Sequence, residues 1–411
     1  MNSKRRHTYA LIWTLACANT ALYGLPFMKS QFYDVMMSVL HLNHMQLSML
    51  FSINGAICLF AYAFGGIITD YFSTKKIMIL ALVVSGALHF YVITVPSYII
   101  LCFIYAAFAA TSVLVFYPAS MKALSLLGEN KENGKIFGSY IAAIDIIGLA
   151  VVGVGLATMM LSNSNVLVFR VIVGLYAILH FTAAYFLYKL YDNEDIKSKS
   201  ERIVFKEIVK IIKDPKLWGV TVMIFCNYLM LAATTYIIPF LSDVYEMNET
   251  AILVISIFRV NIIAIILAPM AGRIVDKIHS ATKLMLWTFA ISIGLSILMM
   301  ASITFKISSI ALICIILLIS AAIVSAKSLN LVTLSEINIP RSYMGTAIGL
   351  VSFIGYSPDA FFYTVAGWAI DKYQTGGYRL IFFSMLFCAI LGTMASLFVL
   401  QVKSKEKGQI I

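Results

Sequence analysis

Long apolar segments recur along this chain, and they constrain its fold more than any other feature. Twelve stretches of roughly 20 residues or more are dominated by hydrophobic side chains. As a helix, each stretch would cross about 30 Å of hydrocarbon, whereas a transmembrane β-strand needs only about ten residues of alternating polarity. Hydrophobic residues make up 61% of the chain and charged residues 12%, against roughly 45–50% and about 25% in soluble domains. The sequence therefore predicts an all-α integral membrane protein.

A single long polar segment, residues 192–216, falls at the midpoint and divides the chain into 1–191 and 217–411. Each part is predicted to form a bundle of six transmembrane helices. Within the central segment, residues 201–213 place aliphatic side chains among lysines, which fits either an amphipathic helix on the membrane surface or a solvated linker. The first outer loop, 30–46, is expected to be the longest outer one. The predicted spans are 8–29, 46–69, 76–96, 98–124, 136–161, 165–190, 217–241, 250–272, 282–303, 308–334, 345–369 and 380–401.

The distribution of positive charge predicts the topology. With the N-terminus inside, the inner segments hold 23 Lys and Arg residues, and the outer segments hold four, Lys29 among them. This bias places both termini and the central segment in the cytoplasm, in a cytoplasmic (inner) membrane. The formal net charge of +11 then reflects topology and contact with lipid headgroups, and no nucleic acid partner is expected.

Motifs for cofactor, metal or enzymatic chemistry are not found in the sequence. The six cysteines all fall inside apolar segments without a Cys-x-x-Cys pair, so they are interpreted as small buried side chains. No Walker motif, metal-ligand cluster or nucleophile and base pair is present. The basic N-terminus is similar to the start of a signal peptide, but the apolar run behind it reaches about residue 28, which favours a first transmembrane helix. We expect no cofactor, no metal and no enzyme activity.

A loop pattern occurs twice, about half a chain apart, and the two aspartates that mark it are separated by 206 residues. The glycine lies on the last turn of a span, where a missing side chain would let another helix approach closely. The aspartate lies at headgroup level, where it can pair with a basic residue or a helix N-terminus, or can simply end the helix. A third Gly-x-x-x-Asp, Gly367 to Asp371, falls on the outer side and has no counterpart in the first half. The first copy comprises Gly66, Asp70, Lys75 and Lys76, and the second comprises Gly272, Asp276, Lys277 and Lys283.

Six plus six spans with this loop pattern in both halves resemble the major facilitator superfamily. In that family the loop reads G-x-x-x-D-[RK]-x-G-[RK]-[RK]; this chain departs from it at Tyr71, Ser73 and Thr74, and its second copy is nearer the family form. Patterns after span 1 and in span 11 are similar to the oxalate/formate antiporters and organic-anion permeases. The resemblance implies two pseudo-symmetric six-helix bundles that alternate access to a central site. It also implies that the loop motif gates the cytoplasmic side.

Five charged side chains lie inside predicted spans, where each costs at least about 2.5–3.5 kcal/mol. Arg259 and Asp359 are near mid-membrane, Asp145 is in span 5, Lys327 is toward the inner third of span 10, and Arg170 is near the outer end of span 6. Arg259 is predicted to bind substrate, because a guanidinium can hold a carboxylate in bidentate fashion. In the oxalate-type transporters that the chain resembles, an arginine of span 8 has this role. A structural ion pair between Arg259 and Asp359 is the alternative.

Asp359 follows Pro358, which is expected to kink span 11 beside a central cavity. Asp359 and Asp145 are both candidates for proton coupling, and the sequence does not choose between them. The span 11 lysine of the oxalate-type transporters has no match here. Lys327 is expected either to bind substrate or to extend to the inner interface, and Arg170 to anchor its helix.

Polar side chains could line the cavity. Asn19 and Tyr23 share one face of span 1, and Asn227 lies in span 7; hydrogen bonding between helices is the alternative for each. His89 and His180 are single imidazoles with no ligand spacing, which is typical of histidines satisfied within a bundle.

These observations predict a secondary active transporter, monomeric, that moves a small polar organic solute across the inner membrane by proton coupling or exchange. The small surplus of buried positive charge favours an anionic solute. Two alternatives remain open: a proton-driven exporter of hydrophobic compounds, and a transporter-like sensor or scaffold without transport.

Overall fold

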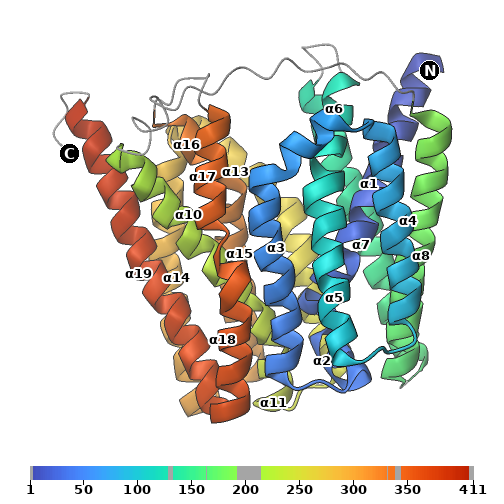
Figure 1. Ribbon diagram of the computed structural model, residues 1–411. Helices are drawn as coiled ribbons and strands as arrows, with labels where there is room; N and C mark the ends of the chain where they lie inside the picture. Colours follow the sequence, from blue (N-terminus) through green and yellow to red (C-terminus); the bar gives the residue numbers. More distant parts are fainter. Residues whose placement is uncertain are drawn as a thin grey trace. The chain divides into compact units, whose positions relative to one another are not determined.

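The computed structural model describes residues 3–127, 133–162, 164–191, 214–330, 332–337 and 344–406 (Figure 1). All regular secondary structure in these residues is helical, which confirms the all-α fold. The central segment lies almost wholly outside the described residues, so the amphipathic helix expected at 201–213 stays a prediction.

Contacts between Cα atoms divide the chain into two compact units. The first comprises Met1–Leu42 and Met49–Ser200, and the second comprises Asn43–Ser48 and Glu201–Ile411. The division falls within one helix, because the first residues of α3 belong to the second unit. The elements of the first unit are α1 (Ser3–Phe27), α2 (Lys29–Leu40), α3 (His44–Tyr71), α4 (Thr74–Val92), α5 (Tyr98–Ala109), η1 (Ala110–Phe116), α6 (Tyr117–Leu126), α7 (Asn133–Leu161) and α8 (Asn165–Leu190).

The second unit contains several helices that break within a predicted span. In the chain, η1 and η3 are short π-helices and η2 is a 3₁₀-helix. The elements are α10 (Pro215–Ala233), η2 (Thr234–Tyr236), α11 (Ile237–Asp243), α12 (Glu249–Ile257), η3 (Phe258–Ile262), α13 (Ile263–Ile278), α14 (Ala281–Phe305), α15 (Ser309–Leu329), α16 (Val332–Ser335), α17 (Met344–Gly355), α18 (Pro358–Tyr373) and α19 (Thr375–Glu406).

Eleven helical stretches in the described residues are long and apolar enough to cross a membrane. The twelfth predicted span, 345–369, is not continuous, because α17 ends at Gly355 and α18 begins at Pro358. Proline fits the first turn of a helix, where its missing N–H has no intrahelical partner. Pro358 therefore starts a new helix, and the prediction that it kinks a continuous one is corrected.

The prediction of a long first outer loop at 30–46 is also wrong. Residues Lys29–Leu40 form α2, which follows α1 after Met28, and only three residues separate α2 from α3. Phe32 has non-helical backbone angles (φ −124°, ψ 34°), so this segment is bent. The apolar side chains of Phe32, Tyr33 and Val35 are buried, and this burial favours a packed helix over a solvated loop.

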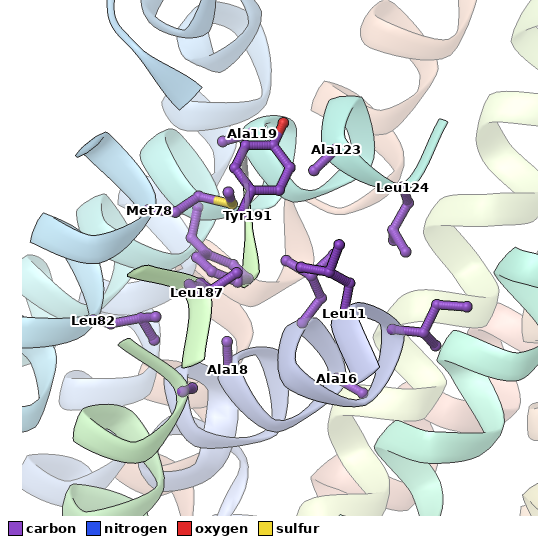
Figure 2. Close-up of a cluster of buried hydrophobic side chains, with 14 of the residues drawn as sticks. Leu11, Ala16, Ala18, Met78, Leu82, Ala119, Ala123, Leu124, Leu187 and Tyr191 are labelled. Carbon is purple, nitrogen blue, oxygen red and sulfur yellow. The ribbon is translucent and has the colours of Figure 1, made fainter. Parts of the chain in front are cut away.

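The first unit packs around small and aliphatic side chains from α1, α4, α6, α7 and α8. Figure 2 shows this cluster, in which Leu11 and Ala16 of α1 lie among Met78 and Leu82 of α4 and Leu187 of α8. In a lipid environment such contacts stabilise through close packing, because lipid tails are as apolar as leucine. The cluster fixes the positions of α1 and α4 within the first unit.

Candidate functional site

The break in α10–α11 is the element around which the candidate site is built. Pro239 lies in the first turn of α11 and has no N–H to donate to the carbonyl of Thr235, four residues earlier. The chain forms the 3₁₀ turn Thr234–Tyr236 at this point, and all three of its residues are buried. A break at this depth leaves backbone carbonyls available to side chains of other helices.

Arg259 binds one of those carbonyls. Its side chain is only 3% exposed, and its Nη1 donates a hydrogen bond of 3.0 Å to the carbonyl oxygen of Thr234. Arg259 lies in the π-helix η3, a type of helical bulge that is frequent at functional sites. Arg259 therefore contacts the 3₁₀ turn between α10 and α11, in the same unit.

Asp359 reaches the same turn through two tyrosines. It lies half-buried in the first turn of α18, within hydrogen-bonding reach of the Tyr363 hydroxyl. The carbonyl of Tyr363 accepts a hydrogen bond of 2.7 Å from the Tyr236 hydroxyl. Arg259, through the Thr234 carbonyl, and Asp359, through Tyr363, are therefore both connected to the buried turn Thr234–Tyr236.

An aromatic pair lies beside the break in span 11. The rings of Tyr228, on α10, and Tyr356, between α17 and α18, are 4.6 Å apart between centroids. A guanidinium, a carboxyl group and tyrosines offer donors, an acceptor and flat apolar faces. This combination can hold a small organic solute that carries negative charge.

Asn227 and Lys327 occupy different surroundings. Asn227 is 1% exposed and bonds across to α15, either to the Asn330 side chain at 3.3 Å or, with its amide flipped, to the Ile323 carbonyl and the Lys327 N–H. In both orientations it joins α10 to α15, as the alternative of interhelical hydrogen bonding predicts. The Lys327 side chain is exposed.

The candidate residues of the first unit are Asn19 and Tyr23 on α1 and Asp145 on α7, each half-buried. Lys29, which sequence reasoning assigned to an outer loop, is 7% exposed, with its Nζ 4.8 Å from the centroid of the Phe51 ring. Cation–π contact compensates part of the cost of burying the ammonium group. The apolar residues Phe27 and Met28 before Lys29, and Phe32 and Tyr33 a few residues after it, were a signal that it lies inside the protein.

His89 and His180 form a pair, contrary to the interpretation of each as a single imidazole. Their ring centroids are 4.6 Å apart, and each Nδ1 lies near the carbonyl four residues earlier on its own helix. Both side chains are fully buried, and their Nε2 atoms make no hydrogen bond to the described part of the chain. Gly86 allows this approach, because a Cβ there would lie 2.8 Å from the Phe181 ring. Sequence spacing gives no sign of a pair on two helices.

The loop motif is described only in part. The surroundings of Gly66 and Asp70 are outside what the structure describes, whereas Lys75 Nζ is 5.3 Å from the centroid of the Tyr188 ring. In the second copy, a Cβ on Gly272 would meet no heavy atom within 4 Å, so this glycine does not provide a close helix approach here. The side chains of Lys76, Asp276 and Lys277 are exposed.

Glu336 is a functional candidate that the sequence reasoning missed. Its carboxylate accepts hydrogen bonds from the amide of Ala281 and from the Thr282 hydroxyl at 2.8 Å, and so caps the N-terminus of α14. Lys403 of α19 forms an ion pair with it at 2.7 Å. Partial burial favours the neutral acid, but the bonds from Lys403, Thr282 and Ala281 outweigh burial and hold the pKa of Glu336 below its ordinary value.

Metal coordination is not supported by the described ranges, in which no group of three or more His, Cys, Asp or Glu side chains could hold an ion. The arrangement combines a buried cation, a half-buried carboxyl group and a short 3₁₀ turn in an all-helical fold.

Comparisons with known proteins bear on the family and the fold. The chain is 26% identical to the inner membrane protein YihN of Escherichia coli (strain K12) over 413 residues, which cover 98% of each chain. A crystal structure of the nucleoside transporter NupG, in a mutant form, has a TM-score of 0.74 and 13% identity, covering 95% of this chain and 99% of that one. The D-xylose-proton symporter has a TM-score of 0.71 and 17% identity, covering 95% of each chain.

At these identities the solved structures establish the fold. The sequence profile described as Major Facilitator Superfamily matches residues 14–362, which is most of the chain. Together with the duplicated loop motif and the helical spans, this match establishes that the chain belongs to the major facilitator superfamily.

Proposed function

We propose that this chain transports a small organic anion across the inner membrane by alternating access, coupled to protons or to exchange of a second solute, with Arg259 as the anion contact. Secondary transport itself follows from membership of the superfamily and from the transporters that share its fold. The anionic substrate, the coupling and the cytoplasmic placement of both termini are the parts proposed here.

The observation that carries the proposal is the burial of Arg259 against the carbonyl of Thr234. A guanidinium has five N–H donors in a planar fork, so a contact with one carbonyl can coexist with a bidentate contact to a carboxylate or phosphate. Arginine keeps its charge in proteins. A permanently charged group this deep in a membrane protein is costly unless it has a structural or a binding role.

Asp359 is proposed as the proton carrier in preference to Asp145. Asp359 is joined through Tyr363 and Tyr236 to the turn that Arg259 binds. A proton gained or lost at Asp359 would thus change the charge next to the anion contact. Asp145 lies on α7 of the first unit.

The first experiment replaces Arg259 with lysine in protein reconstituted into liposomes. Lysine keeps the charge but not the fork, so uptake of an anionic substrate should fall about 100-fold, the equivalent of one or two charge-assisted hydrogen bonds. Arg170→Lys is the matched control, because Arg170 is exposed on α8 and its change should leave uptake within about twofold. Near-normal uptake by Arg259→Lys would contradict the assignment and favour a structural role.

A panel of organic anions, neutral solutes and hydrophobic compounds, each tested at two pH values, identifies the substrate class. Uptake driven by a pH gradient in the parent but not in Asp359→Asn supports proton coupling at Asp359. Loss of pH coupling in Asp145→Asn alone would reassign it to Asp145. Transport of hydrophobic compounds only would favour the exporter, and no flux of any solute would favour a sensor or scaffold.

A further inference from the structure

Two helices of the first unit, α4 and α8, pack against each other (Figure 1). A Cβ on Gly86 of α4 would lie 3.0 Å from the Cβ of His180 on α8. Farther along the pair, Lys75 Nζ is 5.3 Å from the centroid of the Tyr188 ring. Residue numbers therefore fall along α4 as they rise along α8, which makes the two helices antiparallel. The start of α4 lies beside the end of α8.

Three lysines gather at that end of the helix pair. Lys75 and Lys76 lie in the first turn of α4, and Lys189 lies in the last turn of α8. Lys76 and Lys189 are exposed, and Lys75 is half-buried. Within the described part of the chain, none of the three forms an ion pair. Like charges that lie close together repel, so an anion among these lysines would be stabilised.

The two lysines of α4 are unfavourable for their own helix. The N-terminus of a helix carries partial positive charge, which favours acidic residues in the first turn and disfavours basic ones. The first turn of α4 has no acidic residue. An anion bound beside this turn would offset both the charge of the lysines and that of the helix end.

An apolar surface runs from the lysines along both helices. On each helix the exposed apolar side chains recur every three or four residues or at multiples of that spacing, so they share one face. The surface ends where the rings of Phe90 and Phe181 stack, 5.8 Å apart between centroids. The exposed side chains are Leu80, Val83 and Phe90 on α4, and Phe181, Tyr185 and Tyr188 on α8.

The length of this surface matches one leaflet of a membrane. At 1.5 Å per residue, the helix from Lys76 to Phe90 extends over about 21 Å, which is half of the roughly 40–45 Å of a bilayer with its headgroups. Tyr185 and Tyr188 lie between the lysines and the purely apolar part. Tyrosine is frequent at that depth, because its ring contacts acyl chains and its hydroxyl contacts headgroups.

We propose that the α4–α8 surface binds one anionic phospholipid, with the headgroup phosphate among Lys75, Lys76 and Lys189 and an acyl chain along the exposed apolar side chains. The lysines favour an anionic headgroup over a zwitterionic one, whose ammonium group they repel. The apolar surface favours a lipid over free phosphate. The proposal concerns lipid binding and does not depend on Arg259 or on the solute that is carried.

Native mass spectrometry of the full chain in detergent tests the proposal. Phosphatidylglycerol and phosphatidylcholine with identical oleoyl chains are added in separate titrations, and the parent should bind phosphatidylglycerol at least about tenfold more tightly. The variant Lys75→Gln/Lys76→Gln/Lys189→Gln should lose about 100-fold in affinity for phosphatidylglycerol, because each lysine near an anionic headgroup contributes about fivefold. Its affinity for phosphatidylcholine should change much less.

The matched control removes three cations from the second unit. Lys306, Lys372 and Arg379 are exposed, and their combined glutamine variant should bind phosphatidylglycerol within about twofold of the parent. Tyr188→Leu keeps every charge but removes the ring beside Lys75, so it should weaken binding about threefold. Inorganic phosphate should not displace the bound lipid.

Several results would overturn the proposal. Equal affinity of the parent for the two lipids would remove the headgroup selectivity, and equal losses in the two glutamine variants would show that net charge alone attracts the lipid. Displacement by inorganic phosphate would indicate a site for free anions. A dimer that excludes the lipid and is lost in Tyr188→Leu would make the surface a contact between two copies of the chain.

A salt titration of the parent keeps the test decisive if the triple glutamine variant is not produced. Raising ammonium acetate from about 0.1 M to about 1 M shortens the screening length from about 10 Å to about 3 Å. The preference for phosphatidylglycerol should then fall toward that for phosphatidylcholine. A preference that is unchanged at high salt would contradict a headgroup site made of lysines.

Discussion

In the second unit, two carboxylates each cap the N-terminus of a helix, but their surroundings differ. Glu336 caps the N-terminus of α14, and Asp371 caps the N-terminus of α3. Glu336 is half-buried and has Lys403 at 2.7 Å in addition to hydroxyl and amide donors. Asp371 is exposed, and its described hydrogen bonds come from two backbone N–H groups.

The difference corresponds to what each capped helix has to do. α14 lies wholly within the second unit, so a strong cap in a low-dielectric site only fixes it in place. α3 continues beyond the second unit, and Asp371 caps only its first turn. A solvated carboxylate bound to backbone N–H groups provides a weaker contact that water can replace.

The largest expected effect is from Glu336→Gln. The change leaves Lys403 without its ionic partner in a partly buried site, so the free energy of unfolding should fall by about 2–4 kcal/mol. Denaturant titration in detergent micelles measures it. The control is Asp276→Asn, an exposed acid of the loop motif, which should change stability by less than about 0.5 kcal/mol. Equal losses of unfolding free energy in the two variants would show that the contacts of Glu336 do not stabilise the protein more than those of an exposed acid.

The pH dependence of stability sharpens the same point. Because the pKa of Glu336 is lowered in the folded protein, its contribution is complete above the unfolded-state value of about 4.3 and is lost as the pH falls through the folded-state pKa. The parent should therefore lose stability more steeply than Glu336→Gln as the pH is lowered below about 4.3. Parallel curves for the two proteins, followed by fluorescence in micelles, would contradict this assignment.

A smaller loss is expected from Asp371→Asn, at about 1 kcal/mol. Asparagine keeps one acceptor oxygen for the first turn of α3 but loses the charge and the second oxygen. The comparison predicts that this loss is clearly below that of Glu336→Gln in the same denaturant titration. A loss equal to or larger than that of Glu336→Gln would mean that the Asp371 cap is at least as strong as the Glu336 cap.

Sequence reasoning predicted the helical architecture well, because hydropathy acts on whole segments. The all-helical fold and the superfamily are confirmed, and eleven of the predicted spans are long apolar helices. The positions at which helices end inside a predicted span were harder to predict from the sequence. Pro358 was recognised as a disruption, but whether proline kinks a helix or begins a new one depends on the tertiary packing around it.

Contacts between distant segments explain the other misses. Lys29 looked like a loop residue because charge alone was counted, yet the Phe51 ring from another helix covers it. Glu336 and the pairing of His89 with His180 depend on which helix faces are adjacent, which one sequence does not show. The outer Gly-x-x-x-Asp was set aside because it had no repeat, whereas its partner is the start of α3.

The smallest expected effect concerns the glycine of the second loop motif. A Cβ at Gly272 meets no heavy atom within 4 Å, so Gly272→Ala should raise stability by up to about 1 kcal/mol through the higher helix propensity of alanine. Gly367→Ala should have the opposite sign, because its Cβ would lie 2.5 Å from the His44 carbonyl oxygen. Denaturant titration of the two variants compares them directly.

If Gly272→Ala leaves stability unharmed but slows transport, a helix must approach Gly272 in another state of the transport cycle. The loop motif would then act as a gate at this end of α13. If it affects neither, the glycine at the end of α13 has no packing role, and only the outer glycine carries out the close approach that the motif suggested.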